Sequence, residues 1–256
     1  MTPDETLSER VRRERFASDS TELYENVSSI HHRFAHVFAC PAVVDAKRHR
    51  QHLLDRLLPD ATVLDYGCFE GASIPLYLAG GPHRLVGIDI SEKGIATARE
   101  RFGDRAEFQV ADAHALTAFD DGSFDLIVGA AILHHLDLDV AVGEIHRLLR
   151  PGGAALFTEP LATNPLGALW RRLTPQARTA DEAPLSRRDL TALDEMFSSS
   201  DHWFSSITST PIAVATSLLP MAPDNVLLRA AGAVDRRLQE TPLRWGARTV
   251  YIHWVK

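Results

Sequence analysis

The 256-residue sequence has few cysteines and no long hydrophobic run. Its two cysteines, Cys40 and Cys68, are too few for a disulfide framework, so we expect both to be free thiols. No apolar stretch reaches the roughly 18 residues that a membrane-spanning helix needs. The polar N-terminus has no apolar segment of the kind that a secretory signal requires. We therefore expect a cytoplasmic protein with no membrane partner.

The sequence also lacks an excess of positive charge. Its 27 Lys and Arg face 34 Asp and Glu, which gives a formal net charge of −7. A nucleic-acid partner normally requires a basic surface, so we expect none. Hydrophobic residues make up 45% of the chain, enough for one large α/β domain with additions.

Strand-like and helix-like segments alternate between residues 61 and 158. This alternation predicts a parallel sheet with helices on both faces. Ser91 is a natural N-cap, and Pro151 with two glycines gives a strong helix stop. The predicted strands span 61–66, 84–89, 106–110, 124–132 and 154–158, and the predicted helices 71–79, 91–102 and 140–149.

Both flanks of this region have helical features. Residues 1–20 are charge-rich and predict a partly ordered helix or arm. Apolar residues recur at helical spacing from Thr21 to about Leu58, with a break at Pro41. On the C-terminal side we expect helices at 164–172, 186–197 and 225–239 and strands near 202–207 and 250–255.

A glycine-bearing loop follows the first predicted strand. Gly67 and Gly71 let the backbone pass close to a ligand at the carboxyl end of the sheet, although glycines there can also serve a tight turn. Asp89, at the end of the second predicted strand, is placed to accept hydrogen bonds from ribose hydroxyls. Together these residues favour a nucleotide-like cofactor.

The loop does not fit the dinucleotide fingerprint. That pattern needs Gly-x-Gly-x-x-Gly, whereas residues 67–72 read Gly-Cys-Phe-Glu-Gly-Ala. A nicotinamide-dependent oxidoreductase on a similar fold therefore stays only as an alternative.

Five segments in order resemble the class I S-adenosylmethionine-dependent methyltransferases that act on small molecules. They are the loop 61–71, Gly-Ile-Asp-Ile at 87–90, Ala-Asp-Ala at 111–113, and the stretches 129–137 and 147–157. The match covers roughly residues 58–160. It implies a Rossmann-like, doubly wound, seven-stranded, mostly parallel sheet with an antiparallel last strand.

The resemblance also implies a division of the chain and a cofactor. Residues 1–58 would form an N-terminal helical lid, and residues 59–256 the core, with substrate-side insertions at about 160–185 and 208–246. The latter insertion is expected to be helical. The cofactor would be S-adenosyl-L-methionine, with S-adenosyl-L-homocysteine as its product.

The same resemblance assigns cofactor contacts. Asp65 and Gly67 fall near the methionine end, Asp89 on the ribose and Asp112 on the adenine amino group. Asp112 alone could also be a turn-capping residue. The expected set is Asp65, Gly67, Cys68, Phe69, Gly71, Asp89, Ile90, Asp112, Ala113 and Ala130.

Phe69 departs from the family pattern, because it fills the middle position of the usual glycine-rich loop. A left-handed backbone would be strained there, so we expect an ordinary conformation and intact binding. Its ring could pack beside the cofactor or substrate. The departure leaves a non-catalytic binding protein that keeps the fold as another alternative.

Candidate catalytic residues follow the fourth and fifth predicted strands. His134 and His135 lie close to where the methyl group should be presented, and Glu159 lies beyond the fifth strand. A histidine with a pKa of about 6.5 can take a proton from a substrate hydroxyl or ammonium. The pair could equally cap the loop or pack structurally.

The remaining candidates concern metals and the substrate. His32 and His36 are one helical turn apart but have no ligand partner at a recognisable spacing, so we expect no metal. Tyr24 and His36 are expected on a lid over the cofactor, a packed helix face being the alternative. Trp170 lies in the segment 159–185, which resembles an extension in some bacterial small-molecule methyltransferases and would contact substrate or cover the sheet edge.

The leading hypothesis is methyl transfer from S-adenosylmethionine to oxygen, nitrogen or carbon of a small molecule in bacterial specialised metabolism. A homodimer is a further option. The acceptor itself is not identified by any motif.

Overall fold

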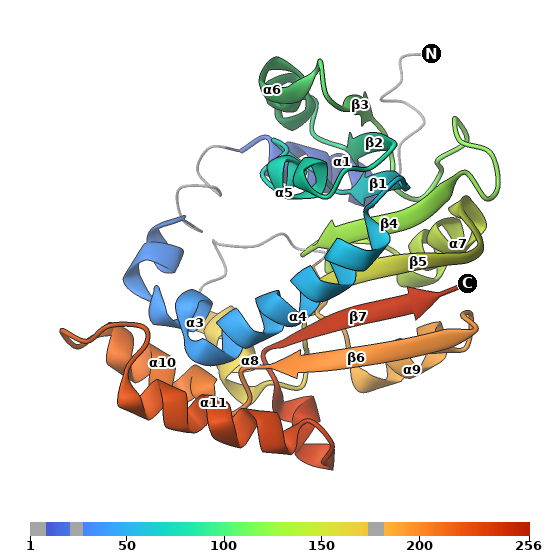
Figure 1. Cartoon of the computed structure of the whole chain (residues 1–256). Coiled ribbons are helices and arrows are strands. Elements are labelled where there is room, and N and C mark those ends of the chain that lie inside the picture. The colour runs from blue at the N-terminus through green and yellow to red at the C-terminus, as the bar shows by residue number, and fades with distance from the viewer. Residues whose placement is uncertain (1–8, 21–27, 174–181) are drawn as a thin grey trace.

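A single seven-stranded sheet organises the protein (Figure 1). The computed structural model describes residues 9–20, 28–173 and 182–256. The strand order is β3-β2-β1-β4-β5-β7-β6, and β7 is antiparallel to β5 and β6 while the pairs from β3 to β5 are parallel. This confirms the predicted fold class. The strands are β1 Thr62–Tyr66, β2 Arg84–Asp89, β3 Glu107–Val110, β4 Phe124–Ala130, β5 Leu149–Pro160, β6 Ser199–Ser205 and β7 Thr249–Val255.

Helices cover both faces of the sheet. One face carries α4 (Pro41–Leu57), α5 (Ile74–Ala79) and α6 (Glu92–Phe102), and the other carries α7 (Leu138–Leu148) and α9 (Arg187–Asp194). Side chains alternate along each strand, so Val63 of β1 packs on the α4 face while Leu64 packs on the α7 face. Burying a side chain of this size stabilises the fold by roughly 1.5–3 kcal/mol.

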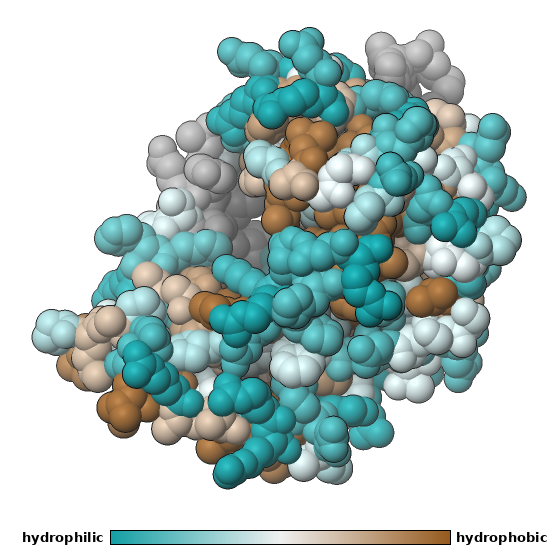
Figure 2. Space-filling model, in the orientation of Figure 1, coloured by the Kyte–Doolittle hydropathy of each residue, from teal (hydrophilic) through white to brown (hydrophobic). Residues whose placement is uncertain are grey.

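A smaller helical layer lies beyond the β6 edge, where Figure 1 shows α10 (Ser209–Ser217) and α11 (Val226–Leu238) side by side. Val37, Cys40, Ala213 and Leu228 join these helices to α3 (His36–Ala39) and the start of α4. Figure 2 shows apolar side chains at this end, and others in the upper and central part of the view, among largely hydrophilic ones. With η4 (Pro242–Gly246), these elements are the expected C-terminal helical insertion.

Several boundaries differ from the sequence-based expectation, those of β5 and α5 among them. β5 begins at Leu149 rather than at residue 154, because Leu149 pairs with Phe124 before a register shift brings Ala154 opposite Leu126. α5 begins at Ile74 because the residues before it form turns. Both cysteines are free and buried, as expected.

Within the described residues, no helix is long and apolar enough to cross a membrane.

Candidate functional site

A cavity of about 330 Å³ lies at the carboxyl ends of β1, β2, β3 and β4. The loops that follow these strands form its floor and sides. The helix α1 (Glu9–Ser18) forms a further wall. Of the expected cofactor and catalytic residues, the cavity is lined by Gly67, Phe69, Asp89, Ile90, Asp112, Ala113, Ala130 and His135.

Glycine is required at position 67 for two reasons. Its φ of +80° is in the left-handed region, which favours glycine. A Cβ added there would lie 2.7 Å from the side chain of Ile132, which also lines the cavity. The backbone N–H groups of Gly67 and Cys68 both donate to the Ile88 carbonyl at 2.9 Å, which ties the loop to β2.

Phe69 contradicts the expectation of an ordinary backbone conformation, because its φ is +45°. Its N–H donates to Asp89 Oδ2 at 2.9 Å, and the Gly71 N–H closes the turn onto the Cys68 carbonyl at 2.8 Å. The ring packs over Gly94 of α6, where an added Cβ would lie 2.8 Å from Phe69 Cδ2. These contacts hold a strained residue in place, at a typical cost of about 1–3 kcal/mol.

Asp89 connects the two loops that follow β1 and β2. Its Oδ2 accepts the Phe69 N–H, and its Oδ1 accepts the Ser91 N–H at 2.8 Å. Burial raises the pKa of Asp89, although these backbone hydrogen bonds act in the opposite direction. A carboxylate has about four acceptor positions, so Asp89 can still accept from a ligand in the cavity.

Asp112 is held by His114. The His114 Nε2 accepts the Asp137 N–H at 2.9 Å, so the Nδ1–H donates to Asp112 Oδ1 at 2.7 Å. Burial would raise the pKa of Asp112, but hydrogen bonds from the ring and the backbone N–H of His114 lower it overall. Both bonds use Oδ1, which leaves Oδ2 of Asp112 available to a donor in the cavity.

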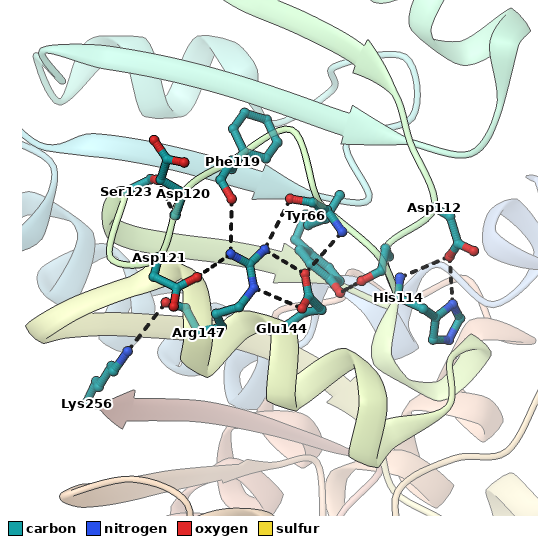
Figure 3. A network of polar contacts seen from close by, with 12 residues as sticks. Tyr66, Asp112, His114, Phe119, Asp120, Asp121, Ser123, Glu144, Arg147 and Lys256 are labelled. Atoms are coloured by element: carbon teal, nitrogen blue, oxygen red, sulfur yellow. Dashed lines mark hydrogen bonds and ion pairs between the residues drawn. The ribbon is translucent and has the colours of Figure 1, made fainter.

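Helix α7 clamps the loop that carries Asp112, as Figure 3 shows. Arg147 donates to the carbonyls of Leu116 and Phe119 at 3.1 and 3.0 Å, and Glu144 accepts the Leu116 N–H at 3.1 Å. The Tyr66 hydroxyl, at the end of β1, donates to the Ala113 carbonyl. The position of this loop therefore depends on Arg147, Glu144 and Tyr66. All three lie in the segment 58–160, which also contains the sequence motifs.

The helix α1 is fixed to the loop after β4. Arg10 donates to the carbonyls of His135 and Leu136 at 3.0 and 2.9 Å, and Glu14 lies 3.1 Å from His135 Nδ1. Val11 of the same helix is buried against the cavity. Sequence reasoning missed these contacts, because the only signal was a charge-rich N-terminal segment.

His134 and Glu159 form a buried pair behind the cavity. Glu159 is fully buried, and its Oε1 accepts the N–H groups of Ile132 and Leu133 at 2.9 and 3.0 Å. Its Oε2 lies 2.7 Å from His134 Nδ1. A carboxylate at Nδ1 favours the tautomer with the proton on that nitrogen and the lone pair on Nε2. Glu159 thus positions His134 rather than facing the cavity.

His134, His135 and Glu182 come together in space. One potential ligand atom from each lies within 4.8 Å of the others, so the three could hold a metal ion. The expectation of no metal stays a prediction. Burial would lower the pKa of His135, but the hydrogen bond and charge of Glu14, with the charges of Glu182 and Glu159, raise it overall. The cluster has the chemistry needed for proton transfer.

A second cavity, of about 480 Å³, lies on the far side of this cluster. Glu182 lines it, whereas His135 lines the first cavity, so the cluster lies between the two. Its other walls come from α3, the segment after β5, α8 (Pro165–Leu173) and α10. Nine of its lining residues belong to the segment 159–185, which we expected to contact substrate or to cover the sheet edge.

Three of the expected cofactor residues do not line the first cavity. Asp65 lies on the α4 face of β1, where its Oδ2 is buried with no hydrogen-bond partner and burial raises its pKa to about 7. Cys68 is buried, with its Sγ against Gly87. Gly71 has φ +77°, and an added Cβ would lie 3.1 Å from Ile74 and Phe102. Gly71 therefore serves the turn.

The expected lid and substrate residues are placed only in part. His36 is buried, and its Nδ1 lies 2.9 Å from Thr216 Oγ1, so it joins α3 to α10 and lines neither cavity. Trp170 lies in α8, and its side chain is outside what the structure describes. Tyr24 lies outside the described residues.

The first cavity fits the expected cofactor chemically. Asp89 and Asp112 are acceptors at the ends of β2 and β3, and a nucleoside presents donors in its ribose hydroxyls and adenine amino group. The glycine at 67 keeps the backbone close to the cavity. The loop at 67–72 lacks the Gly-x-Gly-x-x-Gly spacing of a dinucleotide site, which disfavours that alternative.

Comparisons with known proteins match the central part of the chain. Residues 64–157 match a family model described as a methyltransferase domain. The ubiquinone biosynthesis O-methyltransferase of Aromatoleum aromaticum is 34% identical over 100 residues, which are 38% of this chain and 42% of that protein. The 27-O-demethylrifamycin SV methyltransferase of Amycolatopsis mediterranei is 35% identical over 112 residues, 41% of each chain. Each alignment thus spans less than half of the relative.

A solved structure shares the fold over most of the chain. A S-adenosylmethionine-dependent methyltransferase from Archaeoglobus fulgidus superimposes with a TM-score of 0.58 at 16% identity. The superposition covers 84% of this chain and 94% of that one. The shared architecture therefore extends beyond the segment that the sequence comparisons match.

Proposed function

Because residues 64–157 form a class I S-adenosylmethionine-dependent methyltransferase domain, we propose that the chain transfers a methyl group to a small-molecule acceptor. One observation supports this most directly: within the matched segment, Asp89 and Asp112 line one cavity with Gly67. The acceptor atom is oxygen, nitrogen or carbon. Neither a nicotinamide-dependent oxidoreductase nor a non-catalytic binding protein is favoured.

The cofactor, when bound, supplies a methyl group on a positively charged sulfur, which is already activated for displacement. The protein must therefore orient the acceptor, exclude water and take up a proton if the acceptor releases one. In our proposal Asp89 accepts the ribose hydroxyls and Asp112 the adenine amino group. His134 accepts the proton at Nε2, and Glu159 holds its ring in position.

The N-terminal segment acts as the lid in this proposal. Contacts of Arg10 and Glu14 with the loop after β4 support the role for α1. The later part of α4 instead packs on the sheet through Leu54. The boundary at residue 58 and the insertions at about 160–185 and 208–246 stay predictions.

The biological setting is proposed by analogy. The two relatives are named for ubiquinone biosynthesis and for a rifamycin derivative, which supports a small-molecule acceptor in bacterial specialised metabolism. The net charge of −7 supports the absence of a nucleic-acid partner. A cytoplasmic location and a homodimer stay predictions.

The test is isothermal titration of the chain with S-adenosylhomocysteine. We expect Asp89→Ala to weaken binding roughly a hundredfold, because hydrogen bonds to a charged group contribute about 1.5–3 kcal/mol each. Asp104→Ala, at an exposed position after α6, is the matched control and should bind as the native chain does. No binding by the native chain, or equal binding by Asp89→Ala, would refute the proposal.

A further inference from the structure

The second cavity is largely apolar but contains one unusual cation. Phe34, Val37, Phe38, Leu161 and Val214 are among its lining residues. Arg248, directly before β7, also lines it. An apolar cavity with one charged group favours a ligand with an apolar body and one complementary charge.

Arg248 has no counter-ion in the part of the chain that the structure describes. Among the described residues, no carboxylate lies within ion-pair distance of its guanidinium, and its Nε is buried without an acceptor. One terminal nitrogen donates to the Val37 carbonyl at 3.4 Å, and the guanidinium lies 5.2 Å from the centre of the Phe38 ring. These contacts replace little of the hydration that a buried guanidinium loses.

The neighbours of Arg248 do not supply a negative charge either. The titratable groups that face it are Tyr251, Cys40 and His31, and none of them is a carboxylate. Burial lowers the pKa of Arg248, and burial with the charge of Arg248 lowers that of His31. Arg248 therefore lies in largely apolar surroundings without a neutralising carboxylate among the described residues.

The other charged groups of the cavity have contacts of their own. Glu182 belongs to the cluster with His134 and His135. The backbone N–H of the next residue, Ala183, donates to the His134 carbonyl at 2.8 Å, which holds this segment beside the cluster. Arg171 donates to the Ala162 carbonyl at 3.3 Å. Arg248 is thus the lining cation for which the described residues offer no carboxylate partner.

We propose that the second cavity binds the methyl acceptor as an apolar molecule carrying one oxyanion, which pairs with Arg248 while the reacting atom faces the His134 cluster. The inference rests on the proposed function, because it identifies this cavity as the acceptor site. A planar guanidinium pairs with a carboxylate through two parallel hydrogen bonds. Neutral molecules of the same shape would leave the buried cation unpaired.

The test uses two matched pairs of probes, decanoate with decanol and 2-naphthoate with 2-naphthalenemethanol. Each is titrated calorimetrically into the full chain saturated with S-adenosylhomocysteine. We expect at least one acid to bind at least tenfold more tightly than its alcohol. Arg248→Gln should abolish that preference while changing the affinity for the alcohol less than threefold, and Arg248→Lys should retain part of it.

Arg229→Gln is the matched control, because Arg229 is exposed on α11 and pairs with Asp224 at 2.7 Å. It should retain the full preference. Thermal melting of Arg248→Gln and Arg248→Met checks folding. We expect no large decrease in Tm, since each change removes an unpaired buried charge. A purely structural Arg248 would instead lower Tm in both variants and weaken acid and alcohol alike.

The outcomes separate the two proposals. If S-adenosylhomocysteine does not bind, the proposed function fails. If it binds but neither acid binds, or the acids show no preference over the alcohols, or Arg248→Gln keeps the preference, the proposed function stands and this inference is refuted.

Discussion

The two cavities are built in different ways. The first is formed at the carboxyl ends of β1, β2, β3 and β4, where two carboxylates, Asp89 and Asp112, line it. The second is formed by apolar side chains from several separate segments and contains Arg248, which has no carboxylate partner among the described residues. A polar side chain at the end of a strand is positioned by a few neighbouring residues. The first cavity can therefore be recognised from short sequence motifs. The second combines segments with no fixed spacing, and only the resemblance of the segment 159–185 to a substrate-side extension pointed to part of it.

The largest expected effect comes from His134, which lies where the two cavities approach each other. His134→Gln should lower kcat roughly 10²–10⁴-fold, because it removes the proposed proton acceptor. The affinity for S-adenosylhomocysteine should change less than twofold. Production of S-adenosylhomocysteine, followed with the best acid of an acceptor panel, measures the rate. His83→Gln, at an exposed position, should behave as the native chain; a His134→Gln variant with native kcat would exclude the assigned role.

Two helical glycines test how closely the first cavity is packed. A Cβ at Gly94 would lie 2.8 Å from the ring of Phe69, whereas a Cβ at Gly143 of α7 would have nothing within 4 Å. Gly94→Ala should therefore lower Tm and weaken binding of S-adenosylhomocysteine about tenfold, since overpacking typically costs 1–3 kcal/mol. Gly143→Ala should stabilise the fold by about 0.5–1 kcal/mol with unchanged binding. Equal effects of the two substitutions would contradict the role of Phe69.

A smaller effect is expected from the clamp on the Asp112 loop. Arg147→Gln removes the bonds to the Leu116 and Phe119 carbonyls, so the loop should loosen and binding of S-adenosylhomocysteine should weaken several-fold. Arg84→Gln breaks an exposed pair with Glu107 of the same sheet and should leave binding unchanged. If both variants bind equally well, α7 does not support the cofactor cavity.

The smallest expected effect is the pH dependence of α1 docking. Since the folded pKa of His135 is raised, its contribution to stability is fully present below the unfolded pKa of about 6.5 and is lost as pH rises through the folded pKa. The difference in Tm between the native chain and Glu14→Gln should therefore be larger at pH 6 than at pH 8.5. Glu9→Gln, on an exposed part of the same helix, should show no such trend. A Tm difference between the native chain and Glu14→Gln that grows with pH would contradict this prediction.

The sequence predicts the first cavity better than the second for physical reasons. The alternation of strand-like and helix-like segments predicts the strands from β1 to β5. Because these strands are parallel, their carboxyl ends bring Gly67, Asp89 and Asp112 to one edge of the sheet. Position 69 shows the limit. Its left-handed conformation depends on the hydrogen bond to Asp89 and on packing over Gly94, both of which are tertiary contacts.

Other assignments needed the three-dimensional structure. Period-2 alternation places Asp65 on one face of β1, but only the structure shows that this face packs on α4 rather than facing the cavity. Glu159 stands beyond a strand, as a candidate base would, yet the fold buries it behind His134. Arg248 carries no local signal, because its significance lies in the absence of a nearby carboxylate among the described residues.

Hydrogen exchange measured by mass spectrometry would test the two-cavity account most directly. S-adenosylhomocysteine should slow exchange at residues 67–71 and 111–116, whereas an acid that binds in the presence of this product should slow it at 34–38 and 161–169. Both ligands should protect residues 132–136, where the cavities approach each other. Protection of the same segments by both ligands, with none specific to the acid, would contradict the account.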